Sequence, residues 1–137
     1  MLSGSAIDLT GNNTKSKSET ETTNRVAGLL ELARSESAHG PSWTAGGEDL
    51  NVKLLVFHAG EGVIEHVNTE VDVLMVAISG QGVLTIDGQL QTLSSGDAVV
   101  VSEGSSRGIK AESERFAYLT CHRRRGGLRP RLEKRSG

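Results

Sequence analysis

The sequence predicts an all-β sandwich or barrel of the Greek-key or jelly-roll type, preceded by one short helix. From about Ser42 onward, short runs of alternating apolar and polar residues follow one another at regular spacing. The chain has 17 glycines, and several lie between these runs, where tight turns are needed. Asp87–Gly88 joins two runs, and this pair is a strong hairpin signal because both central residues of the turn need positive φ.

The segments before the strands predict a mobile arm and then a helix. Residues 1–23 are rich in Ser, Thr, Asn, Lys and Glu, a composition typical of disordered chain. The next segment, TNRVAGLLELARSES, predicts a short amphipathic helix with Asn24 as its N-cap, because its apolar residues recur at helical spacing. These residues are Val26, Leu29, Leu30 and Ala33. Their stripe must pack against the sheet or against a partner subunit.

About eight strands are expected in the rest of the domain. Seven of them are indicated by the runs SWTA, DLNVKLLVFH, VLMVAIS, VLTI, QLQTL, AVVV and ERFAYLTC. Gly46–Gly47 separates the first two runs, and Gly96–Asp97 precedes AVVV. The predicted organisation is therefore an arm (1–23), a single barrel domain with its preceding helix (24–122) and a basic tail (123–137).

Composition excludes several classes of protein. The 137 residues suffice for one domain with a core. The single cysteine, Cys121, rules out an internal disulfide framework. The first residues do not have the basic and apolar segments of a secretory signal, and no apolar run approaches the ~20 residues of a membrane helix. We expect a cytoplasmic protein that makes no membrane contact.

Charge is distributed unevenly along the chain. The net charge is −2, but the tail 123–137 has seven basic residues against Glu133 alone, which gives +6 and leaves −8 for the rest. A body of this charge opposes nucleic-acid binding. With 3% aromatic residues, it also offers no stacking platform for bases. Nucleic acid is therefore not an expected partner, and the tail is interpreted as a solvated extension.

Two spaced patterns carry a family resemblance. They are Gly62, His66-x-Asn68 and Gly80, then Gly96-Asp97, Ser102-x-Gly104 and Arg107. Together they resemble the two motifs of the cupin family, G-x5-H-x-H-x3,4-E-x6-G and G-x5-P-x-G-x2-H-x3-N. The resemblance covers residues 49–123. It implies a double-stranded β-helix, usually dimeric, with a pocket inside one end of the barrel.

The chain departs from the family at most of the implied metal-ligand positions. His66 matches the first histidine, whereas Asn68 replaces the second and Arg107 replaces the last. The family glutamate falls on Asp72 when counted from Asn68 and on Val73 when counted back from Gly80, a disagreement that a β-bulge would reconcile. We favour Asp72 over Val73, because residues 66, 68, 70 and 72 would face one side of an uninterrupted strand.

The chemistry of these residues predicts a ligand pocket in place of a secure metal site. A transition metal needs three or four converging lone-pair donors. His66 is a good donor, Asp72 or Glu70 an acceptable one and Asn68 a weak one, while Arg107 has only N–H groups. The interpretation is an eroded metal motif. We expect a pocket of His66, Asn68, Asp72 and Arg107 that binds a small molecule.

Arg107 has three alternative roles. It pairs with Asp72 or Glu70, it binds a carboxylate or phosphate of the ligand, or it lies in water at the mouth of the barrel, as most arginines do. No catalytic residue is assigned, and no cofactor is expected.

Two alternative functions stay open. One is a metal-dependent enzyme of the oxygenase, isomerase or lyase type, in which a divalent metal binds His66, Asn68 and Asp72 and gains a further ligand from His58 or His122. The other is a non-catalytic dimeric interaction module whose pocket is filled by side chains such as Met75 or Leu84. A homodimer is expected in each case, because a barrel of this kind has an exposed sheet edge and a spare amphipathic helix.

Overall fold

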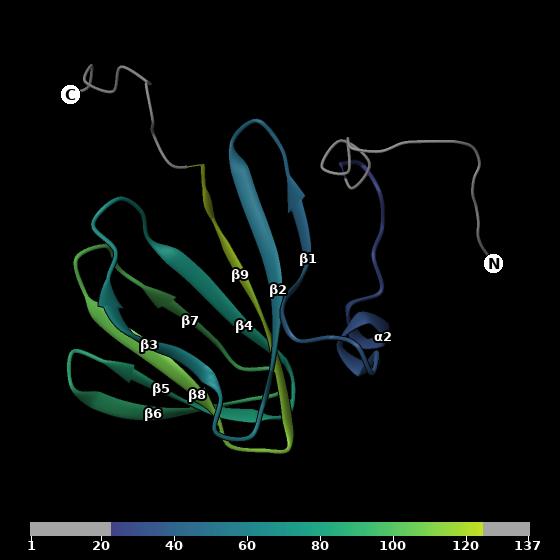
Figure 1. Ribbon diagram of the computed structural model, residues 1–137. Coiled ribbons are helices and arrows are strands. Elements are labelled where there is room, and N and C mark those ends of the chain that lie inside the picture. The colour runs from purple at the N-terminus through teal and green to yellow at the C-terminus, as the bar shows by residue number, and fades with distance from the viewer. Residues whose placement is uncertain (1–22, 125–137) are drawn as a thin grey trace.

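The computed structural model describes residues 23–124, which form two antiparallel sheets that face each other, with one short helix outside them (Figure 1). The elements in chain order are α2 (Leu29–Arg34), β1 (Gly40–Gly46), β2 (Leu50–His58), β3 (Gly62–Val67), β4 (Val73–Ser79), β5 (Gln81–Ile86), β6 (Gln89–Ser94), β7 (Ala98–Val101), β8 (Ser106–Ala111) and β9 (Arg115–Arg123). The predicted all-β fold class is confirmed. The predicted arm and basic tail lie almost entirely outside the described residues.

The strands alternate between the two sheets. One sheet has the order β1-β2-β9-β4-β7 and the other has the order β3-β8-β5-β6. The chain therefore crosses between the sheets six times, after β2, β3, β4, β6, β7 and β8, as a jelly-roll type of barrel requires. Of these strands, β3 and β8 were missing from the runs read in the sequence. Their sequences, GVIEHV and SRGIKA, have too many polar residues to alternate cleanly.

The predicted hairpin between β5 and β6 is confirmed. Asp87 has φ 48° and Gly88 has φ 85°, the two positive values that the turn needs. The Asp87 carboxylate also accepts a hydrogen bond from the Ser106 N–H at 2.9 Å. This contact attaches the hairpin to the start of β8.

The helix begins later than predicted. Asn24 has φ 65° and lies outside the helix, and Gly28 is the N-cap residue, without a side-chain cap. The prediction of Asn24 as N-cap was wrong, because a helix from Asn24 would have Gly28 in its interior, where glycine is unfavourable. Val26 is fully exposed and does not belong to the apolar stripe.

The shortened helix packs on the outer face of its own sheet. Ala33, with Leu29 and Leu32 beside it, forms a second core with Leu54 and Val56 of β2 and other residues of that face. Arg115 of β9 donates hydrogen bonds to the carbonyl oxygens of Ala33 at 2.9 Å and Ser35 at 2.7 Å. These bonds satisfy carbonyl groups that the helix end leaves open. No helix among residues 23–124 is long and apolar enough to cross a membrane.

Between the sheets, the main core fills the barrel near the start of β9. The side chain of Phe116 has no solvent exposure and lies against Gly82, where a Cβ atom would be 2.5 Å from the phenyl ring. Gly80, the last glycine of the first pattern, has φ 78° and would place a Cβ 2.1 Å from the Arg115 carbonyl oxygen. Both glycines allow β5 to approach β9 closely and close this end of the barrel.

Candidate functional site

The other end of the barrel interior contains a cavity of about 220 Å³. Its apolar lining consists of Leu55, Val63, Val73, Met75, Leu84 and Ile109, with the backbone of Gly108. Its polar lining consists of Lys53, His66, Arg107, Tyr118, Thr120 and His122. No Asp or Glu is among these lining residues. The cavity therefore has an apolar wall and a polar wall, and the formally charged residues of the polar wall, Lys53 and Arg107, are both positive.

Strand β9 supplies a row of three polar side chains. Tyr118, Thr120 and His122 alternate along the strand and therefore project from the same face, toward the cavity. Lys53 of β2 pairs directly with Thr120 in the sheet register. The His122 Nδ1–H donates to the Arg123 carbonyl oxygen at 2.7 Å, which leaves Nε2 as the nitrogen with a lone pair in the neutral ring.

His66 and Arg107 lie side by side on adjacent strands of the other sheet. They are direct partners in the register of β3 and β8, and Arg107 Nε donates to His66 Nε2 at 3.3 Å. The His66 Nδ1–H donates to the Ile64 carbonyl oxygen at 3.0 Å. Together these bonds define the neutral tautomer with the proton on Nδ1. The lone pair that would bind a metal accepts a hydrogen bond from the guanidinium.

The side chains of Asn68 and Asp72 are engaged elsewhere. The Asn68 amide oxygen accepts from the Glu70 N–H at 2.9 Å, and its amide nitrogen donates to the Val71 carbonyl oxygen at 3.2 Å. This Asx-type turn follows the end of β3 at Val67. Asp72 accepts from the Glu103 N–H at 2.8 Å. Neither residue is among those that line the cavity.

The assumption of one uninterrupted strand over residues 66–72 was therefore wrong, because Asn68 turns the chain. Of the two counted positions for the family glutamate, only Val73 lines the cavity, and neither Asp72 nor the nearby Glu70 does. The count back from Gly80 thus reaches the residue that lines the wall, and the extra residue lies in the turn between Asn68 and Val73. The register shift of β4 against β9 between Ala77 and Ser79 lies beyond Val73 and does not cause the disagreement. The cavity wall thus has a valine, Val73, at the place where we had predicted the carboxylate of Asp72.

These donors do not fit a tightly held divalent metal. No three His, Cys, Asp or Glu side chains within residues 23–124 form a group that could hold a metal ion. The His66 lone pair accepts from Arg107, and the Arg107 cation is adjacent. A fixed positive charge beside a prospective ligand opposes metal binding.

Tyr118 is the most deeply buried polar residue of the cavity. The residue is 2% exposed, and its ring stacks on Phe116 with ring centroids 5.3 Å apart. Burial raises the pKa of the phenol well above its ordinary value, although the charge of Arg107 opposes this shift. Its hydroxyl makes no hydrogen bond to another residue in the range 23–124. A buried hydroxyl normally has a partner, so this group is available to bind a molecule in the cavity.

Sequence reasoning missed Lys53, Tyr118 and Thr120 as cavity residues and gave His122 only as a supplementary metal ligand. The alternation in RFAYLTCHR contains the signal, because Tyr118, Thr120 and His122 share one parity. Which of the two faces of β9 points inward became clear only from the pairing of the sheets.

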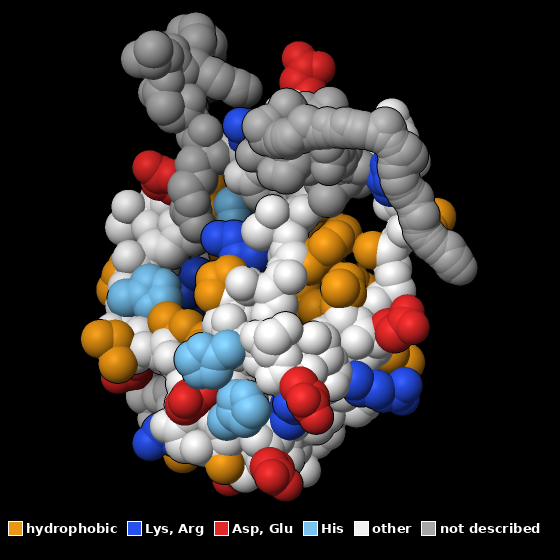
Figure 2. All heavy atoms as spheres, turned by 45° about the vertical axis from the view of Figure 1, so that its right-hand side comes forward, with side chains coloured by type: hydrophobic (Ala, Val, Ile, Leu, Met, Phe, Trp, Pro, Cys, Tyr) orange, Lys and Arg blue, Asp and Glu red, His pale blue; other side chains and the backbone are white. Residues whose placement is uncertain are grey.

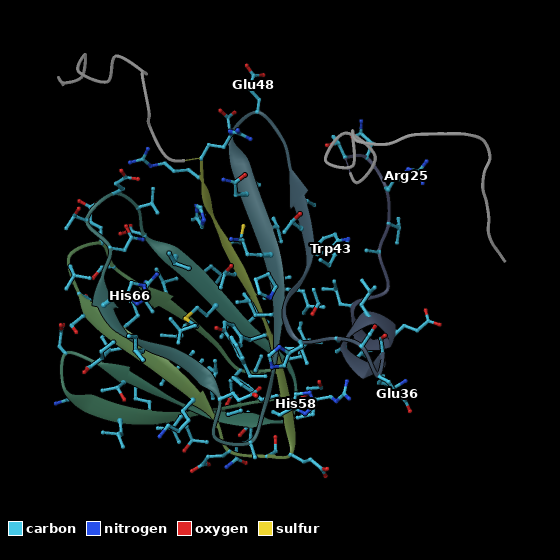
Figure 3. The ribbon with its side chains drawn as sticks, in the orientation of Figure 1. Arg25, Glu36, Trp43, Glu48, His58 and His66 are labelled. Carbon is cyan, nitrogen blue, oxygen red and sulfur yellow. The ribbon has the colours of Figure 1, made fainter. Side chains whose placement is uncertain are left out.

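A second group of titratable residues lies at the other end of the barrel. His39 Nε2 is 3.0 Å from the Glu61 carboxylate, and the rings of His39 and His58 are 5.7 Å apart. Figure 3 labels His58 near the helix, well away from His66 on β3. Figure 2 shows two pale-blue histidines side by side next to red carboxylates on the surface. The His58 N–H, and secondarily His39, lower the pKa of the Glu61 carboxyl. His58 therefore contributes nothing to the cavity.

Comparisons with known proteins establish the fold. No protein-family model and no curated protein sequence matches the chain. Solved structures do match. A cupin protein from Bacteroides fragilis is 28% identical with a TM-score of 0.53, over 58% of this chain and 70% of its own. An uncharacterised protein with a double-stranded β-helix domain from Klebsiella pneumoniae is 21% identical with a TM-score of 0.62, over 73% and 90%.

The cupin domain of Cnp3 from Schizosaccharomyces pombe is also similar, at 12% identity and a TM-score of 0.56, over 65% of this chain and 66% of that one. The chain therefore has the cupin double-stranded β-helix fold. Because this barrel serves many unrelated functions, the fold does not by itself assign an activity.

Proposed function

We propose that this cupin-fold protein binds a small molecule in its barrel cavity without a resident catalytic metal. The observation that supports this most directly is Tyr118, a buried hydroxyl without a hydrogen-bond partner among residues 23–124 that lines a cavity of about 220 Å³. A bound molecule that accepts from or donates to this hydroxyl would satisfy it. The apolar wall would cover the rest of the ligand.

The two alternatives have less support. A metal-dependent enzyme would require His66 to exchange its Arg107 contact for a metal, with no carboxylate in the cavity lining to complete the site. In the interaction module, the pocket would be filled by Met75 or Leu84, but both side chains line the cavity and leave it open. The homodimer and the cytoplasmic location stay predictions.

The test combines metal analysis with ligand screening. Untagged protein, purified without chelator, is analysed for metal beside His66→Ala, and both are then screened by thermal shift against small acids, alcohols and amides, with and without chelator. We expect substoichiometric metal and binding that survives the chelator. Tyr118→Phe should weaken binding by about five- to tenfold, the value of one hydrogen bond.

A matched control is Thr92→Val, which removes a hydroxyl from exposed β6 outside the cavity and should leave binding unchanged. Near-stoichiometric metal that is lost in His66→Ala, together with chelator-sensitive binding, would contradict the proposal in favour of the metal-dependent enzyme.

A further inference from the structure

The charged side chains of the cavity come from opposite sheets and have the same sign. Lys53 lies on β2 and Arg107 on β8, and no carboxylate is among the lining residues. The Lys53 ammonium makes no hydrogen bond or ion pair with another side chain in the part of the chain that the structure describes. An anion placed between two cations that border one partly desolvated space is attracted by both of them.

Arg107 is held in a defined orientation. Its Nε–H is bonded to His66, and His66 is in turn fixed through the Ile64 carbonyl oxygen. A guanidinium also has four N–H donors on its two Nη atoms, arranged as a planar fork that matches a carboxylate. Fixing this fork before the ligand arrives lowers the entropy lost on binding. His66 therefore acts as a positioning residue for Arg107.

The remaining lining favours an organic anion over an inorganic one. Six aliphatic side chains form most of the wall, among them Met75 and Leu84, which are both buried. Phosphate would leave this apolar surface without a partner, whereas an acid with a hydrocarbon body would cover it. The Tyr118 and Thr120 hydroxyls supply further hydrogen-bonding groups between the cations and the apolar wall.

From these three features we infer that the ligand is a small monocarboxylate with an apolar body. Its carboxylate lies between Lys53 and Arg107, and its hydrocarbon part lies against Met75 and Leu84. This inference rests on the proposed function, since it names the chemical class of the molecule that the cavity binds.

The experiment uses the full chain, treated with chelator, and measures binding of three carboxylates by calorimetry and by NMR shifts. The probes are benzoate, cyclohexanecarboxylate and isovalerate, with benzamide as the neutral analogue and inorganic phosphate as the anion without an apolar body. We expect saturable binding of at least one carboxylate, with an affinity at least about tenfold higher than that of benzamide or phosphate.

Variants at the two cations then test the clamp. Arg107→Gln should weaken carboxylate binding by about ten- to hundredfold, the range for a hydrogen bond to a charged group, and Lys53→Gln by about three- to tenfold. Lys110→Gln on the same strand as Arg107 is the matched control, because Lys110 is exposed and does not line the cavity. It should bind as the wild type does. If Arg107→Gln does not fold, Lys53→Gln and the comparison of benzoate with benzamide still decide the outcome.

The unfavourable outcomes separate the two proposals. If benzamide binds as tightly as benzoate, and Tyr118→Phe weakens both, ligand binding stands and the anionic class is overturned. If phosphate binds more tightly than every carboxylate, the inference that the ligand has an apolar body is overturned. If none of the five probes binds, the inferred monocarboxylate class is overturned, while the wider thermal-shift screen with Tyr118→Phe decides separately on the proposed function.

Discussion

The two ends of the barrel interior are built from the same strands and yet differ in what they contain. Near the start of β9, Phe116 fills the space between the sheets, with a glycine opposite its ring. Further along the same strand, Tyr118, Thr120 and His122 border an open cavity. The difference shows that side-chain volume and polarity, on one backbone scaffold, decide which end is a packed core and which is a site.

The largest predicted effect concerns the packed end. Phe116→Ala should destabilise the protein by about 3–5 kcal/mol, because it removes a fully buried ring and leaves a void beside Gly82. Met75→Ala should cost less, about 2 kcal/mol, since Met75 already borders the cavity and has fewer packing partners to lose. Urea unfolding of the wild type and both variants measures the two losses in the free energy of unfolding. Equal losses would mean that the two ends are packed alike.

An intermediate effect is expected at the boundary between the two ends. Because burial raises the pKa of Tyr118, the unfolded chain releases this proton at lower pH than the native state does. Wild-type stability should therefore be unaffected below about pH 10 and then fall by up to about 1.4 kcal/mol for each further pH unit. Tyr118→Phe should lack this component and should have nearly wild-type stability at neutral pH.

Unfolding of both proteins across alkaline pH measures this difference directly. Tyr118 is the only tyrosine of the chain, so tyrosinate absorbance reports on it alone. Ionisation of the native wild type with an ordinary phenol midpoint near pH 10 would show that the hydroxyl is in contact with water.

The smallest effect is expected at the histidine group far from the cavity. The pKa of Glu61 is lowered, so its contribution to stability should be present above the ordinary carboxyl pKa of about 4 and lost as pH falls through the lowered native value. Glu61→Gln should be slightly less stable than wild type at neutral pH and equal to it in acid. A urea series at several pH values measures this gap, and a gap that persists at about pH 2 would contradict an electrostatic origin.

Local signals predicted much of the fold. VLMVAIS and AVVV coincide with β4 and β7, and Asp87–Gly88 forms the expected turn, because strand alternation and positive φ are properties of a few neighbouring residues. The late start of α2 is a case in which spacing misled. Val26 continues the helical pattern in the sequence, but it is exposed because the helix begins only after its N-cap residue, Gly28.

The candidate site was less predictable from the sequence. His66 and Arg107 both line the cavity, as the resemblance implied, and they do so as direct partners in the register of β3 and β8. Asn68 and Asp72 appeared to share a strand with His66, but the Asn68 side chain bonds to the backbone of the next residues and turns the chain. Such local competition between a side chain and strand pairing is not visible in spacing alone.

By itself, the sequence determined the fold class, the β5–β6 hairpin and the residue types at positions 68 and 107, where Asn and Arg stand in place of the histidines of the cupin pattern, because each depends on residue type and short-range spacing. Only the tertiary structure decided that Val73, and neither Glu70 nor Asp72, lines the wall, that Lys53 and Arg107 border one cavity and that Tyr118 is buried beside them. These features join residues far apart in the chain. They depend on strand register, and one irregularity such as that between Ala77 and Ser79 changes which side chains point inward.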